Sequence, residues 1–378
     1  MNKVRYIILL WLIVGCRESF IPDFETGVDD FLVVEGFIHA GTKRVTTIEL
    51  SRVIPLGQQV RNPEIRASVS IEAEDGDQFY LTETDRGKYQ TDSLSLPVDK
   101  KYRLRIITRD AAEYASEWVS VSITTAINDV TWSITQSQVV ISVQTTAPNA
   151  TSFYKWDFSE TWELHSDYQS AYYYEFGEFK PRSPEEMNRM YFCWRNARPN
   201  KLFTLSHSPL AGETINYPLT QIFLNSERTS VRYSIMVEQR SLTEAAYNYL
   251  QIIEKNTSIS GSLFDPLPSE VQGNIYSINE NAQAKVIGFM GASTTDYKRI
   301  FILANDLNPI PNAKCPAETF ILSQFESAFR LGGGYMPISV TFVRDEFFQL
   351  NPVQATGAAP YCLDCRLKGG SPVPPDFW

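Results

Sequence analysis

The sequence predicts a mainly β protein, in which an N-terminal β-sandwich is followed by a larger β-rich domain with one or two short helices. Three observations lead to this fold class. Aromatic residues make up 13% of the 378 residues, and aromatic side chains favour strands. Short alternating runs, separated by turn residues, recur through residues 31–125 at the spacing of a β-sandwich. A clear helical period is found near residues 241–256.

The chain begins with a short apolar segment of the secretory type. The nine apolar residues 6–14 follow two basic residues, and this run is far shorter than the roughly 20 residues of a membrane-spanning helix. It is typical of a signal peptide, which we place at residues 1–15. The run ends in Gly-Cys, which resembles the lipobox of bacterial lipoproteins and implies a lipid on Cys16. An ordinary signal peptide that contains a cysteine is the alternative. Residues 16–30 are then expected to be an acidic tether.

Charge and flanking residues bear on location and partners. The formal net charge is −10 and no basic run occurs, which argues against nucleic acid as a partner. Residues 17–19, Arg-Glu-Ser, lack the leading aspartate that retains some lipoproteins in the inner membrane. We therefore expect a protein anchored to the outer membrane through its N-terminal lipid, on either the surface or the periplasmic face.

Residues 31–125 form the predicted first sandwich. Its clearest hairpin is "SVSIEAEDGDQFYLTET", in which Asp75-Gly76 joins two alternating runs. The order of this hairpin, "TETDRGKYQT" and "KKYRLRI" resembles the carboxypeptidase regulatory-like and transthyretin-like sandwiches. The resemblance implies an immunoglobulin-like or transthyretin-like domain. We interpret the acidic triplet at 75–77 as a turn, because a calcium loop needs further oxygen ligands at fixed offsets.

Residues 126–350 form the predicted second domain. The stretch "TSFYKWDFSETWELHSDYQSAYYYEF" has aromatic residues at short intervals. This indicates a strand pair with a half-buried aromatic face or, alternatively, an exposed surface for carbohydrate or peptide recognition. Further on, Ser241 and Glu244 have the spacing of a capping box. An apolar stripe follows them and predicts a helix near 241–256 that packs on the sheet. Residues 351–378 are a Cys/Pro-rich tail.

Several stretches together resemble one family of lipoproteins from Bacteroidota-type bacteria, domain-of-unknown-function family 4249. Members of this family look like outer-membrane lipoproteins encoded beside TonB-dependent receptors, which are energised importers. The resemblance implies an accessory or partner role and no catalytic residues. Besides the lipobox at Cys16, the stretches that carry it are "FLVVEGFI", "YKWDFSETWEL", "RYSIMVEQRSLTEAAYNYLQ", "GSLFDPLPSEVQGNI", "KRIFI" and "CLDCRLKGGSPVPPDFW".

Four further cysteines are disulfide candidates: Cys193, Cys315, Cys362 and Cys365. An exported location is oxidising, and an even number of thiols favours disulfides. Three pairings are open, but a bond within the Cys362/Cys365 pair would close only a tiny loop. We therefore expect a link from Cys193 or Cys315 to this pair, which would pin the tail to the second domain. The usual two-pair spacing of a zinc site and the helix start of a redox pair are both missing, so we expect no metal and no cofactor.

No recognised catalytic pattern such as G-x-S-x-G or H-E-x-x-H occurs, and we do not expect an enzyme. His165 lies between Glu163 and Asp167 on a predicted strand, which is compatible with a metal or acid–base site. A solvated polar strand face is the simpler interpretation. His207 is flanked by serines, with no acid partner to name. A hydrolase with two carboxylates stays open, because their separation is a tertiary property.

These observations predict a lipid-anchored outer-membrane accessory or ligand-binding protein, partner to a TonB-dependent importer, with a nutrient as candidate ligand. A sandwich body on a lipid tether suits a surface adhesin or envelope scaffold without a transport role equally well. That is the alternative, and a hydrolase is less favoured. The sequence leaves open the ligand, the membrane face and the oligomeric state.

Overall fold

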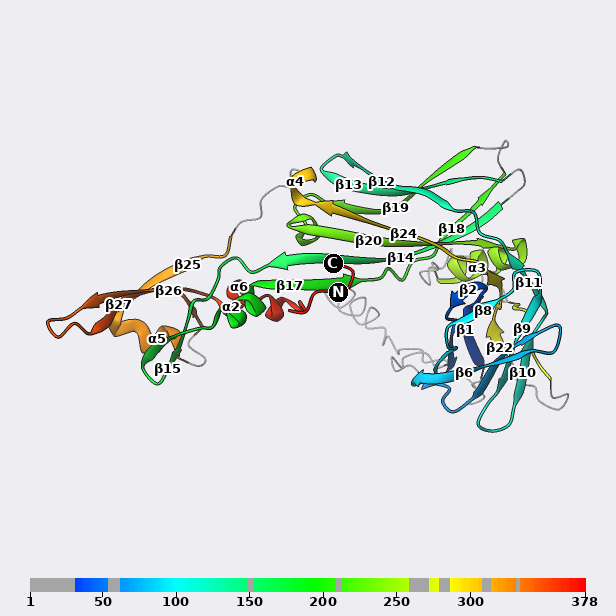
Figure 1. Ribbon diagram of the computed structural model, residues 1–378, viewed down its shortest axis with the longest axis horizontal. Helices are drawn as coiled ribbons and strands as arrows, with labels where there is room; N and C mark the ends of the chain where they lie inside the picture. Colours follow the sequence, from blue (N-terminus) through cyan, green and yellow to red (C-terminus); the bar gives the residue numbers. More distant parts are fainter. Residues whose placement is uncertain are drawn as a thin grey trace, which may run out of the picture.

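The computed structural model describes residues 31–53, 62–148, 152–208, 213–257, 272–278, 286–307, 314–330 and 334–378. Three parts follow one another along the long axis: a first sandwich at one end, a second in the middle and a small lobe at the other end (Figure 1). The predicted signal peptide, the lipid site at Cys16 and the tether lie outside the described residues. Within those residues, no helix is both long enough and apolar enough to cross a membrane.

The first sandwich is built from short strands, most of which lie on one closed path, while β2 and β8 pair with each other in a separate small sheet. From this part of the chain come β1 (Leu32–His39), β2 (Gly41–Arg44), β3 (Thr47–Arg52), β4 (Asn62–Pro63), β5 (Ser68–Ala73), β6 (Gln78–Asp85), β7 (Lys88–Gln90), β8 (Leu94–Leu96), β9 (Lys101–Ile107), β10 (Glu113–Ser116) and β11 (Val119–Ser122). Strand β9 pairs with both β5 and β11, which closes the path. Alternate side chains fill one core, in which Ile48, Ile71 and Tyr102 are fully buried. The predicted hairpin is confirmed, because β5 and β6 pair around the Asp75-Gly76 turn.

Three short strands from much later in the chain complete this sandwich. Strand β21 (Ile275–Ser277) pairs with β10, while β22 (Val286–Gly288) and β23 (Ala292–Ser293) run parallel to β1. The sequence-based division assigns all three to the second domain. The structure instead pairs them with the first, and each is too short for its periodicity to show which sheet it joins. The chain therefore passes between the two sandwiches more than once.

The second sandwich packs a three-stranded sheet on a five-stranded sheet. The first contains β12 (Ile127–Thr135), β13 (Gln138–Thr146) and β19 (Thr214–Phe223). The second contains β14 (Ser152–His165), β17 (Phe192–Ala197), β18 (Phe203–His207), β20 (Arg232–Leu242) and β24 (Asp296–Leu303). Tyr154, Trp156 and Trp162 are buried between the sheets. The predicted half-buried aromatic face is therefore present on β14.

Helix α3 (Glu244–Thr257) lies where the sequence predicts a helix. Its first turn is capped by Thr243, whose hydroxyl accepts a hydrogen bond from the Ala246 N–H at 3.2 Å. The predicted capping box on Ser241 is wrong, because strand β20 continues through Ser241 to Leu242. Shorter helical segments are α2 (Pro184–Tyr191), η1 (Glu227–Thr229) and α4 (Ala304–Leu307).

The distal lobe projects from the second sandwich (Figure 1). It contains the hairpin β15 (Tyr172–Glu175) and β16 (Glu178–Pro181), a sheet of β25 (Ala317–Ile321), β26 (Met336–Arg344) and β27 (Leu350–Ala358), and the helical turns η2 (Leu322–Gln324) and α5 (Phe325–Phe329). Phe325, Phe329 and Ala355 form its small core. Strand β27 includes the first residues of the predicted tail. Helices α6 (Pro360–Leu363) and η3 (Cys365–Lys368) then bring the chain back to the second sandwich.

Candidate ligand-binding groove

The five-stranded sheet has one face toward the core and one face away from it. Along β14, Trp156 and Phe158 are buried, whereas Lys155, Asp157 and Ser159 alternate with them on the other face. The register of the neighbouring strands extends this outward face across the sheet. Between β14 and β20 the paired residues are Lys155 with Arg240, Asp157 with Glu238 and Ser159 with Met236. Between β20 and β24 they are Glu238 with Tyr297 and Met236 with Arg299. The outward face is therefore rich in charge, although it belongs to the central sheet of the molecule.

Two parts of the chain cover the ends of this face. At one end, the guanidinium of Arg240 lies 5.5 Å from the centre of the Phe37 ring of the first sandwich. At the other end, the guanidinium of Arg299 lies 3.5 Å from the centre of the Phe377 ring of the C-terminal tail. Arg240 and Arg299 themselves line a groove of about 510 Å³, the junction groove, whose walls come from the five-stranded sheet and the loop between β17 and β18. Its charged lining residues are Lys155, Asp157, Arg198, Lys201, Glu238, Arg240 and Arg299.

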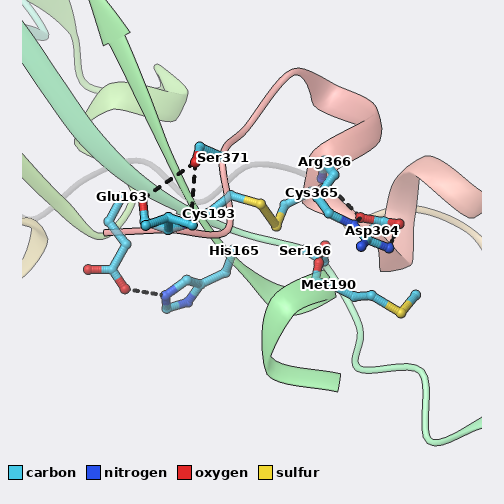
Figure 2. The surroundings of a disulfide bond; sticks show 10 residues. Glu163, His165, Ser166, Met190, Cys193, Asp364, Cys365, Arg366 and Ser371 are labelled. Carbon is cyan, nitrogen blue, oxygen red and sulfur yellow. Dashed lines mark hydrogen bonds and ion pairs between the residues drawn. A yellow bond between two sulfur atoms is a disulfide. The ribbon is translucent and has the colours of Figure 1, made fainter. Parts of the chain in front are cut away.

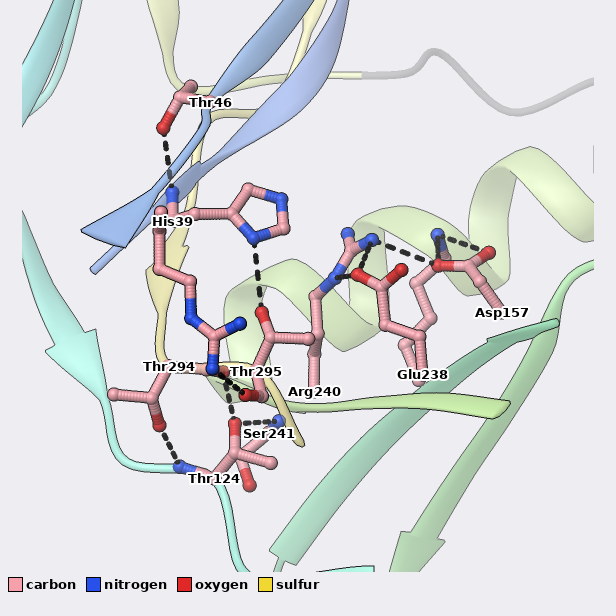
Figure 3. A network of polar contacts seen from close by, with 11 residues as sticks. His39, Thr46, Thr124, Asp157, Glu238, Arg240, Ser241, Thr294 and Thr295 are labelled. Atoms are coloured by element: carbon pink, nitrogen blue, oxygen red, sulfur yellow. Dashed lines mark hydrogen bonds and ion pairs between the residues drawn. The ribbon is translucent and has the colours of Figure 1, made fainter. Parts of the chain in front are cut away.

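Both carboxylates of the groove are taken up by cations of its floor (Figure 3). Asp157 Oδ2 lies 2.8 Å from Lys155 Nζ and 3.2 Å from Arg240 Nη2. Glu238 Oε1 accepts a hydrogen bond from Arg240 Nε at 2.8 Å. Burial acts to raise the pKa of Asp157, but the charges of Lys155 and Arg240 outweigh it and hold that pKa below its ordinary value. Asp157 is therefore ionised at neutral pH and neutralises part of the floor.

The remaining cations have no such partner. Among the described residues, no carboxylate forms an ion pair with Arg198, Lys201 or Arg299. Arg299 donates a hydrogen bond to Ser234 Oγ at 3.1 Å, and burial lowers its pKa from the ordinary value. The Lys201 ammonium lies 5.8 Å from the centre of the Phe203 ring. The groove therefore offers three cations that form no ion pair within the described part of the chain, although Arg198 also contributes to the positive field at Asp157.

His39 joins the first sandwich to the edge of the groove (Figure 3). Its Nδ1 lies 3.1 Å from Thr295 Oγ1. Burial, together with the positive charges of Arg240 and Arg44, lowers the pKa of His39 from 6.5 to about 4. The imidazole is therefore neutral at neutral pH and acts at the junction as a hydrogen-bonding group.

An apolar cavity of about 330 Å³ lies beside the groove, and Lys155 and Arg240 line both. Its walls include Val33 and Phe37 of β1 and the predicted apolar stripe of α3. The stripe therefore faces the first sandwich as well as the sheet on which the sequence predicts it to pack. The residues of that stripe in the cavity wall are Leu242, Ala246, Tyr249, Leu250 and Ile253.

Two disulfides connect the tail to earlier parts of the chain, and Figure 2 shows the one between Cys193 and Cys365. Cys193 of β17 is bonded to Cys365, and Cys315 is bonded to Cys362. Each close cysteine of the tail is thus joined to a distant one, as the sequence predicts. Beyond Cys365, the backbone of Ser371 exchanges two hydrogen bonds with Trp194 at 2.8 and 2.9 Å. This bridge directs the last residues toward Arg299.

The other predicted site residues do not assemble into one constellation. His165 Nε2 lies 2.7 Å from Glu163 Oε1, but Asp167 accepts a hydrogen bond from the backbone N–H of Cys315 instead. His207 Nε2 lies 3.4 Å from Glu213. Within the described residues, one group with metal-ligand spacing occurs, Asp167 with Cys315 and Cys362. Its sulfurs bond to each other, so they are not available as thiolates.

The sequence contains a signal for the groove that strand prediction alone does not use. In "YKWDFS" and "VEQRSL", charged residues occupy every second position beside buried ones. Such alternation shows that each strand has a charged outward face. It does not show that β14, β20 and β24 are neighbours, nor that Arg198 and Lys201 of a connecting loop close over them.

The model of one family, described as domain of unknown function (DUF4249), matches residues 17–299. The cysteine-rich ending that contributes to the resemblance lies beyond this match. No curated protein matches. A two-domain fibronectin type-III segment from chicken tenascin matches with 9% identity, 55% of this chain and 94% of that chain, at a TM-score of 0.16. A likeness at that TM-score supports no inference, and the fold described above rests on strand pairing.

Proposed function

The chain belongs to this domain-of-unknown-function family, and we propose that it is a lipid-anchored outer-membrane accessory or ligand-binding protein that works with a TonB-dependent importer. The signal-like N-terminus with Cys16 supports the anchor. The β-rich body with a groove supports a binding role. The partnership with a barrel needs a surface on which the partner docks, and exposed apolar side chains on the distal lobe support such a surface.

The observation that carries the proposal is the tip of the β26–β27 hairpin. Phe347 and Phe348 are each 80% exposed, and Leu350 beside them is 60% exposed. Such a concentration of apolar side chains at one tip marks an interaction site rather than ordinary surface. The tip lies at the end of the long axis farthest from the first sandwich (Figure 1), so a partner can reach it freely.

The tip is also held in one conformation. Asp345 Oδ1 accepts hydrogen bonds from the backbone N–H groups of Phe347 at 2.8 Å and Gln349 at 2.9 Å. Phe348 has a φ of 61°, which a bulky residue adopts only at a cost. Two aromatic side chains on an ordered turn lose little entropy on binding, which is the usual basis of an interface hot spot.

The test is co-purification of the tagged protein from native membranes in mild detergent, with partners identified by mass spectrometry. We expect a stoichiometric TonB-dependent barrel with the wild type. Phe347→Ser/Phe348→Ser should reduce its recovery about tenfold or more, because hot-spot residues contribute at least 2 kcal/mol each. The matched control is Tyr80→Ser/Ile123→Ser, which removes two exposed apolar side chains of the first sandwich and should recover the barrel normally.

Two outcomes would refute the partnership: no barrel with the wild type, or equal recovery with the tip variant. If a sugar polymer or another envelope protein is recovered instead of a barrel, the adhesin or scaffold function replaces the accessory function. In that case the same tip variant shows whether the hairpin is the contact.

A further inference from the structure

We propose that the junction groove binds a small ligand that carries at least two anionic groups, carboxylate or phosphate. This inference names the chemical class of ligand that the proposed binding protein takes. It rests on the proposed function only for the biological use of the ligand. Binding itself is a property of the groove. The sign of its charge, the way its cations are held and its volume all favour such a ligand.

The charge of the groove is opposite in sign to that of the chain. Five cations and two carboxylates line it, whereas the whole chain has a formal net charge of −10. A cleft lined by one sign of charge concentrates ligands of the other sign. Because Asp157 and Glu238 are already paired with Lys155 and Arg240, the surplus belongs to the other three cations. At least two anionic groups are needed to neutralise most of that surplus.

The surplus cations are positioned rather than freely solvated. Arg299 is sandwiched by contacts: its guanidinium lies over the Phe377 ring and donates to Ser234 Oγ. A guanidinium held in this way keeps donors that match the planar geometry of a carboxylate or the oxygens of a phosphate. Arg198 and Lys201 are exposed on the opposite wall. The groove thus presents one ordered cation and two adaptable cations to the same space.

The volume of the groove limits the size of the ligand. At about 510 Å³ it is that of an ordinary small-molecule site. The ring of Phe37 contacts Arg240 and the ring of Phe377 contacts Arg299, so two of the cations that line the groove are packed against aromatic side chains. Tyr297 adds an aromatic side to the floor. A compact multivalent anion fits this volume better than a long polymer does.

The experiment is isothermal titration calorimetry on the purified full-length protein with its disulfides intact. The probes are citrate, pyrophosphate and, as a neutral molecule, maltose. We expect citrate or pyrophosphate to bind at low salt, maltose not to bind, and added NaCl to weaken the anion binding. The anion that binds more tightly distinguishes carboxylate from phosphate. Absence of binding by both anions, or equal binding of maltose, would overturn the proposal.

The variant that tests the site is Arg198→Gln/Lys201→Gln. Both side chains are exposed, so the fold should be unaffected. We expect the dissociation constant to rise about tenfold or more, the effect of losing charge-assisted hydrogen bonds. The control Lys101→Gln/Arg109→Gln makes the same change of net charge at exposed positions of the first sandwich and should bind like the wild type. An unchanged Arg198/Lys201 variant, or an equal loss in the control, would show that the groove is not the site.

Failure here and failure of the proposed function are distinguishable. If the barrel co-purifies but no anion binds, the accessory role stands and the ligand class is wrong. If citrate or pyrophosphate binds through the groove but no barrel is recovered, the ligand class stands and the transport role falls.

Discussion

Removal of the Cys193–Cys365 disulfide should cost more stability than any single side-chain contact. The bond joins residues 172 apart in sequence, and both cysteines are fully buried. In the chain-entropy model a loop of that length corresponds to about 5 kcal/mol at 25 °C. The Cys315–Cys362 bond lies inside this loop and shortens it by roughly 45 residues, which lowers the figure by only about 0.3 kcal/mol because the dependence is logarithmic. Measured losses are often smaller than the model predicts, so we expect about 3–5 kcal/mol.

The perturbation is Cys193→Ala/Cys365→Ala, measured by guanidinium denaturation followed by tryptophan fluorescence. The comparison variant is Cys315→Ala/Cys362→Ala, whose bond spans 47 residues and corresponds to about 4 kcal/mol in the same model. Limited proteolysis separates the two: the Cys193/Cys365 variant should release the segment around Ser371, because its anchor to β17 is gone. A loss below about 1 kcal/mol, or an equally protected tail in both variants, would refute the reasoning.

Three further outcomes follow from the packing. His39→Gln should flatten the dependence of stability on pH: the folded-state pKa of His39 is lowered to about 4 from 6.5, so the wild type is fully stable above pH 6.5 and loses up to about 3 kcal/mol as pH falls from 6.5 to 4. Denaturation at pH 7 and pH 4.5 checks this, and equal slopes for both proteins would contradict it. Gly36→Ala should destabilise by about 2 kcal/mol or more, because Gly36 has a φ of 149° and a Cβ there would lie 2.6 Å from the Thr47 carbonyl oxygen. Thermal unfolding measures this loss, with Gly76→Ala as the control because a Cβ added there would have no other atom within 4 Å. A smaller drop in Tm for Gly36→Ala than for Gly76→Ala would refute the steric argument. Glu160→Ala should cost about 2–3 kcal/mol, because the buried carboxylate accepts hydrogen bonds from Tyr233 at 2.7 Å and Arg228 at 3.0 Å, while the Arg228 side chain left without its partner is 35% exposed and can be hydrated. The comparison variant for chemical denaturation is Tyr233→Phe, which should lower the free energy of unfolding by about 1 kcal/mol. A smaller loss for Glu160→Ala than for Tyr233→Phe would contradict this prediction.

The local sequence pattern is enough to predict elements that form between residues close together in the sequence. The β5–β6 hairpin follows from alternation around Asp75-Gly76, and α3 follows from its apolar stripe. The start of α3 was misplaced because Thr243 competes with Ser241 as the cap, and only the end of β20 decides between them. The presence of a strand or helix can therefore be derived from its sequence pattern. The residue at which one element ends and the next begins depends on tertiary pairing.

Longer-range pairing was beyond sequence reasoning. Strands β21, β22 and β23 have two or three residues each, so their assignment to the first sandwich comes only from their pairing with β10, β1 and β11. The groove, too, depends on pairing that the sequence does not show. The alternation of Lys155 and Asp157 marks a charged face, but the other residues that line the groove come from the distant strands β20 and β24 and from the loop between β17 and β18. The pairing of the four cysteines was narrowed by loop length but not fixed.

The disulfides and the groove are connected through the tail. Cysteines in an exported chain are usually explained by stability alone, and the entropic argument applies here. In this fold, however, the segment that follows Cys365 also contacts a residue of the groove: it bridges to Trp194 and places Phe377 over Arg299. Loss of the Cys193–Cys365 bond would therefore release the cation that the tail orders. The anchored tail thus links the oxidised state of the chain to the groove, because the same bond that restricts the unfolded chain holds Phe377 against Arg299.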